Sequence, residues 1–144
     1  HLFNFLEQAS QLFECHIYTL GSRDYAHALL PLLDPTGLIF ESRVISAGDY
    51  DCKVIRNLDG KSFYRKDLAR IFPYSSDHCI IIDDTVEVWY RFASKAPPLL
   101  CIRRYEYYWG HKLQPSSRVL PEDDDDELLV KLANLRDIHA LFFQ

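Results

Sequence analysis

Cys79-Ile80-Ile81-Ile82-Asp83-Asp84 is the stretch that decides the fold of this chain. Three consecutive isoleucines are β-branched and leave no polar face, which is typical of a strand covered on both sides of a sheet. Two carboxylates follow at the carboxyl end of that strand, the edge where open α/β sheets bind ligands. Adjacent negative charges repel, so we expect a lysine or a divalent cation beside them. The alternative interpretation is an acidic turn in which Asp84 starts the next element.

Outward from this strand, short apolar runs alternate with helical patterns. We expect further strands at 15–19, 43–45 and 99–102, a β-hairpin at 51–64 with its turn at 57–60, and helices at 3–14, 23–33, 66–71 and 126–143. Ser22 is the expected N-cap of the second helix. This alternation predicts an α/β fold with a mostly parallel, three-layer sheet, a β-hairpin insertion and a C-terminal helix.

The last expected helix is strongly apolar on one side. Its stripe is formed by Leu128, Leu132, Leu135 and Phe142, and the chain closes on Leu141-Phe142-Phe143. The stripe predicts that this helix, its end included, packs on one face of the sheet, because an exposed run of Leu and Phe invites aggregation. A helix that instead docks a partner protein is the alternative.

Composition and charge narrow the class of protein. The 144 residues, 48% of them hydrophobic, are enough for one globular domain with a real core. The net charge of −5 argues against a general nucleic-acid or membrane binder. The four cysteines show no Cys-x-x-Cys spacing, so we expect reduced thiols and no zinc site. Residues 110–125, which include an acidic run, are expected to form a loop or the site of an insertion in a single domain, 1–144.

Polar groups follow the expected strands in an informative order. Thr19 ends the first strand and leads through Leu20-Gly21-Ser22 into a helix start, Lys66 precedes the central strand, and Asp83 and Asp84 end it. A hydroxyl, helix-start amides, an ammonium and two carboxylates are the parts needed to hold a phosphoryl group and Mg²⁺. Taken singly, Thr19 is more simply a strand-end threonine and Lys66 a solvated lysine.

This ordered set resembles the haloacid dehalogenase superfamily, and within it the phosphatases that act on the C-terminal domain (CTD) of RNA polymerase II. The resemblance rests on five segments, which are 16–26, 34–37, 66–68 with 70–73, 81–84 with 88–89, and 135–143. The last segment, Leu135-Arg136-Asp137-Ile138-His139-Ala140-Leu141-Phe142-Phe143, is similar to the closing helix of the large, transcription-factor-associated branch.

The resemblance implies a Rossmann-like haloacid dehalogenase fold and a nuclear, Mg²⁺-dependent protein serine/threonine phosphatase. It implies hydrolysis of the phosphorylated heptad repeats through an aspartyl-phosphate, a general transcription factor as a second partner, and no direct contact with nucleic acid or membrane. The implied catalytic residues are Thr19, Lys66 and Asp83. The implied metal ligands are Asp84 and Asp83, with Asp83 paired mainly to Lys66. The implied phosphate- and substrate-binding residues are Thr19, Leu20, Gly21, Ser22, Arg23, Tyr25 and Arg43.

Two features depart from the family pattern. The Asp-x-Asp-x-Thr strand that carries the nucleophile in this family is absent. We therefore expect that strand to lie outside these residues, a gap in the sheet beside 15–19 or 79–83, and no activity of the chain alone. The second departure is Ala47, where the large branch usually has an arginine after Ser46; Arg56 is a candidate to replace its charge.

Two other functions compete with the phosphatase. A non-catalytic, peptide-binding relative of the same fold is the first, although such a module has no need of the Lys66, Asp83 and Asp84 set. A nucleic-acid platform is the second, built from Arg103, Arg104, Lys112, Tyr105, Tyr107, Tyr108 and Trp109. A half-buried strand with basic side chains reaching toward water explains those residues more simply.

Overall fold

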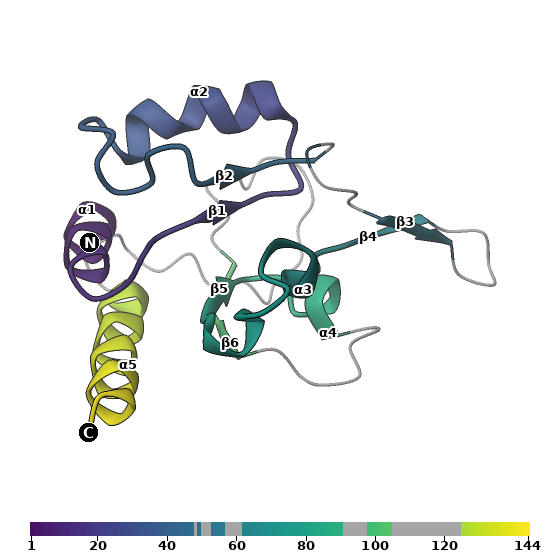
Figure 1. Cartoon of the computed structure of the whole chain (residues 1–144). Helices are drawn as coiled ribbons and strands as arrows, with labels where there is room; N and C mark the ends of the chain where they lie inside the picture. The colour runs from purple at the N-terminus through teal and green to yellow at the C-terminus, as the bar shows by residue number, and fades with distance from the viewer. Residues whose placement is uncertain (48, 50–52, 57–61, 91–97, 105–124) are drawn as a thin grey trace, which may run out of the picture.

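The computed structural model describes residues 1–47, 49, 53–56, 62–90, 98–104 and 125–144. The elements of Figure 1, with the short 3₁₀ helix η1, are α1 (Leu2–Ser10), β1 (Ile17–Tyr18), α2 (Arg23–Leu33), β2 (Val44–Ile45), β3 (Lys53–Arg56), β4 (Ser62–Arg65), α3 (Leu68–Ile71), η1 (Ser76–His78), β5 (Ile81–Asp83), α4 (Glu87–Tyr90), β6 (Leu99–Cys101) and α5 (Glu127–Phe142). The expected α/β architecture is confirmed.

The strands pair as two parallel ribbons and one hairpin. β1 pairs in parallel with β2, with Ile17 opposite Val44, and β5 pairs in parallel with β6, with Asp83 opposite Cys101. The expected β-hairpin is the antiparallel pair β3–β4, in which Lys53 lies opposite Arg65. The parallel pairing brings the carboxyl ends of β5 and β6 to one edge, and the same holds for β1 and β2.

Each parallel ribbon has two outer edges, and neither edge has a strand partner among the described residues. The amides of Ile17 and Thr19 donate toward β2, to Arg43 O and Ile45 O, both at 2.9 Å. Backbone groups alternate along a strand, so those of Tyr18 face the opposite edge of β1. The amide of Ile81 donates to Pro98 O at 2.8 Å, which likewise turns the backbone of Ile82 to the far edge of β5. That a further strand fills the gap stays a prediction.

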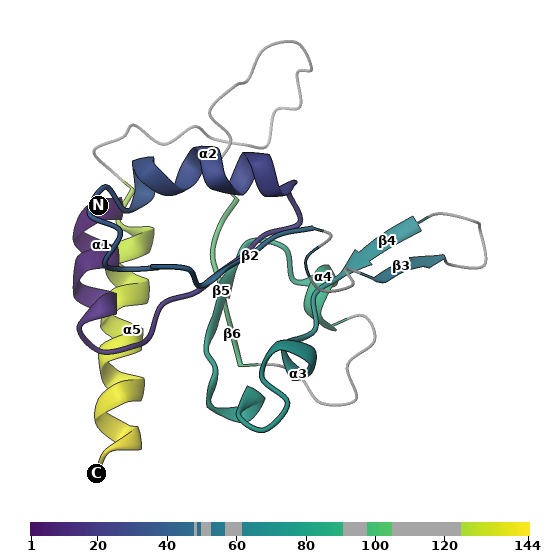
Figure 2. The same ribbon diagram turned by 45° about the horizontal axis from the view of Figure 1, so that its top comes forward.

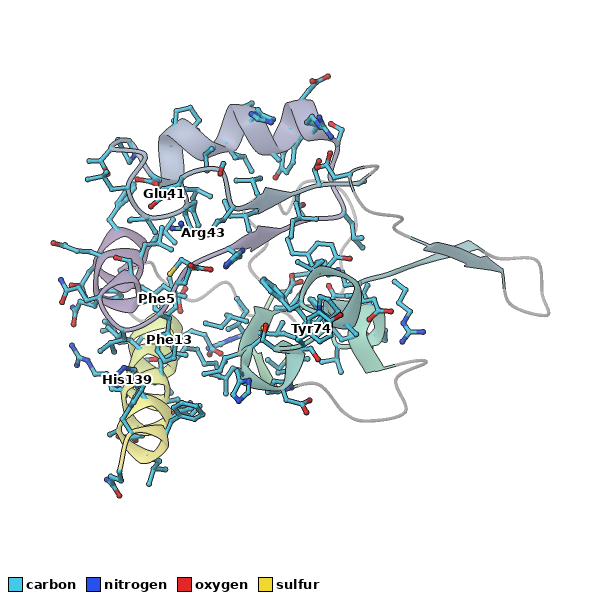
Figure 3. The ribbon with its side chains drawn as sticks, in the orientation of Figure 1. Phe5, Phe13, Glu41, Arg43, Tyr74 and His139 are labelled. Carbon is cyan, nitrogen blue, oxygen red and sulfur yellow. The ribbon has the colours of Figure 1, made fainter. Side chains whose placement is uncertain are left out.

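One core joins both ribbons to the terminal helices. Its buried members are Phe5, Leu6, Ala9, Phe40, Leu132 and Leu135, and partly buried residues of β1, β5 and β6 pack against them. Figure 2 shows α1 and α5 side by side, next to the strands. Phe13 extends this contact, since its ring lies 5.5 Å from that of His139 (Figure 3). The termini therefore close the core of the domain.

Local signals in the sequence explain how α2 begins and how the chain leaves it. The Ser22 hydroxyl accepts the Tyr25 amide at 3.2 Å, which confirms the expected N-cap. After the helix, the buried carboxylate of Asp34 accepts the amides of Ile39 at 2.8 Å and Phe40 at 2.9 Å. These bonds fold the segment back toward β2, so the Asp-Pro-Thr-Gly turn serves the fold.

Several expectations need correction. Helix α1 ends at Ser10, four residues before the expected limit. Lys66 precedes α3 and does not begin it, because Asp67 caps that helix by accepting the Ala69 amide at 3.1 Å. Strand β5 is less enclosed than expected, since only Ile81 among its isoleucines is fully buried.

The expectation for α5 is confirmed in its centre and wrong at its end. Leu132 and Leu135 are buried, at 3% and 4% exposed. Leu141, Phe142 and Phe143 are 64–72% exposed, because the end of α5 extends past α1 (Figure 1). The Phe142 ring still contacts the ring of His78, at 5.9 Å between centroids.

Some expectations fall outside the described residues. These are the hairpin turn 57–60, the aromatic segment 105–109, Lys112 and the loop 110–124. The three described cysteines, Cys15, Cys79 and Cys101, are free thiols. None of the helices in the described part of the chain combines the length and apolar character needed to cross a membrane.

The core position of α5 gives a first prediction. Leu135→Ala should lower the free energy of unfolding by about 2–5 kcal/mol, as for other buried leucines. Leu141→Ala, on the exposed last turn, is the matched control and should leave it nearly unchanged. Urea denaturation followed by circular dichroism measures both. Equal midpoints for the two variants would contradict the assignment of Leu135 to the core.

Candidate functional site

The centre of the candidate site is the carboxylate of Asp83, which is held on both oxygens. Lys66 Nζ lies 2.6 Å from Asp83 Oδ2, and Trp89 Nε1 donates to the same oxygen at 2.8 Å. The backbone amide of Thr85 donates to Oδ1 at 2.9 Å. The side chains of Lys66 and Asp83 are each 10% exposed. A buried charge is tolerated when it is paired and hydrogen-bonded in this way, so the expected pairing of Asp83 with Lys66 is confirmed.

Lys66 also ties β5 to β1 through aromatic rings. Its Nζ lies 5.5 Å from the ring centroid of Tyr18 and 5.2 Å from that of Trp89, within the range of cation–π attraction. The two rings meet edge to face at 5.6 Å. The Lys66 amide donates to Val88 O at 3.2 Å, which fixes the backbone that carries the lysine. The ammonium is therefore held in one place.

The neighbouring carboxylate of Asp84 has a different environment. Its side chain is 33% exposed, and it accepts the Thr85 hydroxyl on Oδ1 at 2.7 Å and Arg104 Nε on Oδ2 at 3.1 Å. The hydrogen bond from Thr85 and, to a lesser extent, the Arg104 guanidinium hold the pKa of Asp84 below its ordinary value, although partial burial opposes them. Asp84 is therefore an ionised carboxylate at the edge of the site.

The turn after β1 is tightly built around a glycine. The Gly21 amide donates to Thr19 Oγ1 at 3.0 Å, and the Ala47 amide donates to Gly21 O at 3.0 Å. A Cβ at position 21 would lie 2.6 Å from Cδ1 of Tyr25, so a larger residue would push the tyrosine ring away. Thr19, Leu20, Gly21, Ser22 and Tyr25 thus form one unit at the carboxyl end of β1.

The two predicted substrate arginines are held by other groups. Arg23, in the first turn of α2, forms an ion pair with Asp49. Arg43 donates to Cys15 O at 3.1 Å and Ile39 O at 2.9 Å, and it pairs with Glu41, which lies beside it in Figure 3. These bonds hold Arg43 at the amino end of β2, where it stabilises the fold. Thr19 lies at the opposite, carboxyl end of the ribbon, so the two side chains are not part of one cluster.

A cavity of about 390 Å³ lies away from these carboxylates. It is lined by Arg23, His27, Leu30, Glu41, Ser42, Val44 and Asp49, that is, by α2 and the chain around β2. Neither Asp83 nor Asp84 contributes to it. The cavity is therefore separate from the charged groups at the end of β5.

The donor set at the end of β5 fits Mg²⁺ better than a metal that needs a complete protein cage. No group of three or more His, Cys, Asp or Glu side chains is placed to hold a metal within the described ranges. Mg²⁺ is commonly bound by one or two carboxylates together with waters and phosphate oxygens. Asp84 offers such a carboxylate, whereas three donors already surround Asp83.

Sequence reasoning missed four residues of this site, namely Tyr18, Thr85, Trp89 and Arg104. Trp89 carried a usable signal, because an apolar helix with a buried indole needs an acceptor for its N–H. Arg104 also carried a usable signal, since it lies shortly after β6 and Asp84 lies directly after β5. The parallel register Asp83–Cys101 brings both to one edge. Arg103 and Arg104, for which a nucleic-acid platform was the less simple interpretation, pair with Glu127 and Asp84.

Comparison with known proteins finds relatives over nearly the whole chain. The model of the family described as NLI interacting factor-like phosphatase matches residues 1–138. RNA polymerase II C-terminal domain phosphatase-like 3 of Arabidopsis thaliana is 38% identical over 99% of the chain, which spans 12% of that protein. An RNA polymerase II C-terminal domain phosphatase of Schizosaccharomyces pombe is 35% identical over 76% of the chain, and the match spans 13% of its length.

A solved structure gives the same relationship. The fission yeast RNA polymerase II CTD phosphatase Fcp1, bound to beryllium fluoride, superposes with a TM-score of 0.75 and 27% identity. The match covers 99% of this chain and 46% of the Fcp1 chain. The chain thus corresponds to part of each protein that it resembles.

The buried ion pair generates a second prediction. Lys66→Met should lower the free energy of unfolding by about 3–5 kcal/mol, because it leaves the carboxylate of Asp83 buried without its cation. The double variant Lys66→Met/Asp83→Asn should recover part of that loss, since the uncompensated charge is gone. Chemical denaturation of Lys66→Met, Asp83→Asn and the double variant tests this. A double variant whose loss equals the sum of the two single losses would contradict the coupling.

Proposed function

The chain belongs to the NLI interacting factor-like phosphatase family, and from this premise we propose that it is part of a Mg²⁺-dependent protein serine/threonine phosphatase that acts on the C-terminal heptad repeats of RNA polymerase II. The observation that carries the proposal is the buried Lys66–Asp83 pair, at 2.6 Å, directly beside the exposed carboxylate of Asp84. A module that only binds peptide gains nothing from an ammonium fixed in this way. The relatives named as CTD phosphatases supply the substrate class.

The residues at the end of β5 have different proposed roles in neutralising the charge of a bound phosphoryl group. Asp84 would hold the Mg²⁺, which supplies charge neutralisation for a bound phosphoryl group. Lys66 adds a second positive charge, and Asp83 with Trp89 fixes its position. Such preorganised charge favours the transition state because no group has to reorient as the reaction proceeds.

The turn after β1 is the proposed cradle for phosphoryl oxygens. The Gly21 amide is already donated to Thr19 Oγ1, so the proton of the Thr19 hydroxyl remains available to a ligand. The amides around Leu20 and Ser22, at the start of α2, add the positive end of the helix dipole. Arg23 and Tyr25, exposed on the first turn of α2, are proposed to contact the substrate chain.

The nucleophile is proposed to come from outside these residues. An aspartate on a strand between β1 and β5 would lie near both Thr19 and Lys66, because the Tyr18–Lys66–Asp83 contacts bring those two edges together. Attack of its carboxylate on phosphorus would form the aspartyl-phosphate while the bond from phosphorus to the serine or threonine oxygen breaks. A second aspartate would protonate that leaving oxygen as general acid and would then, as general base, take a proton from the water that hydrolyses the aspartyl-phosphate. The chain alone is therefore proposed to be inactive.

Partners and location follow from the proposed substrate. RNA polymerase II works in the nucleus, so we place the protein there. Binding of a general transcription factor rests on the resemblance of the closing helix alone. Arg43 is the proposed substrate-binding residue with the least support, because its contacts stabilise the fold. Arg56 remains the candidate to replace the charge missing at Ala47.

The metal assignment gives the experiment that tests the proposal. In the full-length protein, Asp84→Asn should abolish Mg²⁺ binding measured by calorimetry and hydrolysis of a phosphoserine heptad peptide. Asp126→Asn changes an exposed carboxylate before α5 and is the matched control, with both properties retained. Magnesium binding that survives Asp84→Asn would show that the ligand is wrong. A wild-type protein that binds the phosphopeptide and never hydrolyses it would favour the non-catalytic relative.

The phosphate cradle makes a further prediction. Thr19→Val should lower kcat by roughly 10²–10³, the usual loss when one preorganised donor is removed. Thr19→Ser keeps the hydroxyl and should retain most of the activity. Steady-state kinetics on the same peptide distinguishes the two variants. Equal turnover in both would mean that the hydroxyl does not contact the phosphoryl group.

A further inference from the structure

Arg104 closes a ring of three side chains around the carboxylate of Asp84. Arg104 Nε donates to Asp84 Oδ2 at 3.1 Å and its Nη2 donates to Thr85 Oγ1 at 3.1 Å. The Thr85 hydroxyl in turn donates to Asp84 Oδ1 at 2.7 Å. Both carboxylate oxygens therefore have a donor, and one of the donors is a full positive charge.

The topology of the ribbon explains why this arginine reaches this carboxylate. β5 and β6 run in parallel with Asp83 opposite Cys101, so the residues that follow each strand emerge at one edge. Arg103 is turned elsewhere and lies 3.4 Å from Glu127, at the start of α5. Two consecutive arginines thus serve different carboxylates, and only one of them meets the proposed metal ligand.

A guanidinium in this position competes with a divalent cation. Mg²⁺ binds carboxylate oxygens directly and demands near-octahedral geometry, so it needs a lone pair on Asp84 that is free of other donors. Arg104 uses one of the two lone pairs of Oδ2, and its charge repels an approaching cation. Its side chain is 60% exposed, which leaves it room to swing away from the carboxylate.

We propose that Arg104 is a positioning residue that takes the cation side of Asp84 in the metal-free protein and leaves it when Mg²⁺ binds, and so sets the metal affinity of the site. This rests on the proposed function, because it requires Asp84 to be the metal ligand. The consequence is that Asp84 is never left as an unpaired negative charge next to Asp83. The cost is a weaker Mg²⁺ site than the same carboxylates would form alone.

Calorimetric titration of the full-length protein with Mg²⁺, in the absence of substrate, tests the proposal. Arg104→Gln should lower the Kd for Mg²⁺ by roughly twofold to fivefold, the change expected from removing one partly exposed ion pair. Arg103→Gln is the matched control, because it removes an adjacent arginine of similar exposure that pairs with Glu127, and its Kd should equal that of the wild type. Thermal midpoints of the two variants establish that both are folded.

Each other outcome has a definite meaning. An unchanged Kd in Arg104→Gln, or equal changes in both variants, overturns the competition with Mg²⁺. A weaker site in Arg104→Gln overturns it as well, since Arg104 would then orient Asp84 for the metal. Asp84→Asn separates this failure from that of the proposed function. If Asp84→Asn binds Mg²⁺ as the wild type does, or if the wild type binds none, the metal assignment itself is wrong and the role of Arg104 falls with it.

Discussion

The structure depends on one buried ion pair, that of Lys66 with Asp83. It lies where four elements meet: Lys66 follows β4, Asp83 ends β5, Trp89 of α4 donates to the same carboxylate oxygen, and the Tyr18 ring of β1 faces the ammonium. Charges buried to this degree are stable only with every partner in place. The pair therefore fixes how the two parallel ribbons stand relative to each other, even though they share no backbone hydrogen bond among the described residues.

The same pair gives two adjacent aspartates different roles. Asp83 is enclosed by three donors, which leaves it little freedom to bind anything else. Asp84 is directed to the edge, where its carboxylate accepts hydrogen bonds from the side chains of Thr85 and Arg104. In this pair the buried aspartate holds a lysine, and the exposed one is the proposed metal ligand.

Local patterns in the sequence predicted the parts of the fold that depend on neighbouring residues. The Ser22 cap and the apolar stripe through Leu132 and Leu135 are of this kind and are confirmed. The isoleucine run before Asp83 is confirmed as a strand, but one that is less enclosed than expected. The exposed end of α5 could not be predicted, because its exposure depends on the length of α1 beside it. The role of Arg43 in holding backbone carbonyls was missed for a similar reason, since its partners Cys15 and Ile39 are brought to it by the fold. The Arg104–Asp84 contact joins residues 20 apart in the sequence, which the parallel register of β5 and β6 brings to one edge.

The central claim is that Asp83 forms the ion pair with Lys66, whereas Asp84 binds the Mg²⁺. A crystal structure of the full-length protein with Mg²⁺ tests it most directly. We expect Mg²⁺ on the Asp84 carboxylate, with the Lys66–Asp83 contact kept at its present 2.6 Å. A cation bound to Asp83, with the Lys66 ammonium displaced from that carboxylate, would contradict it.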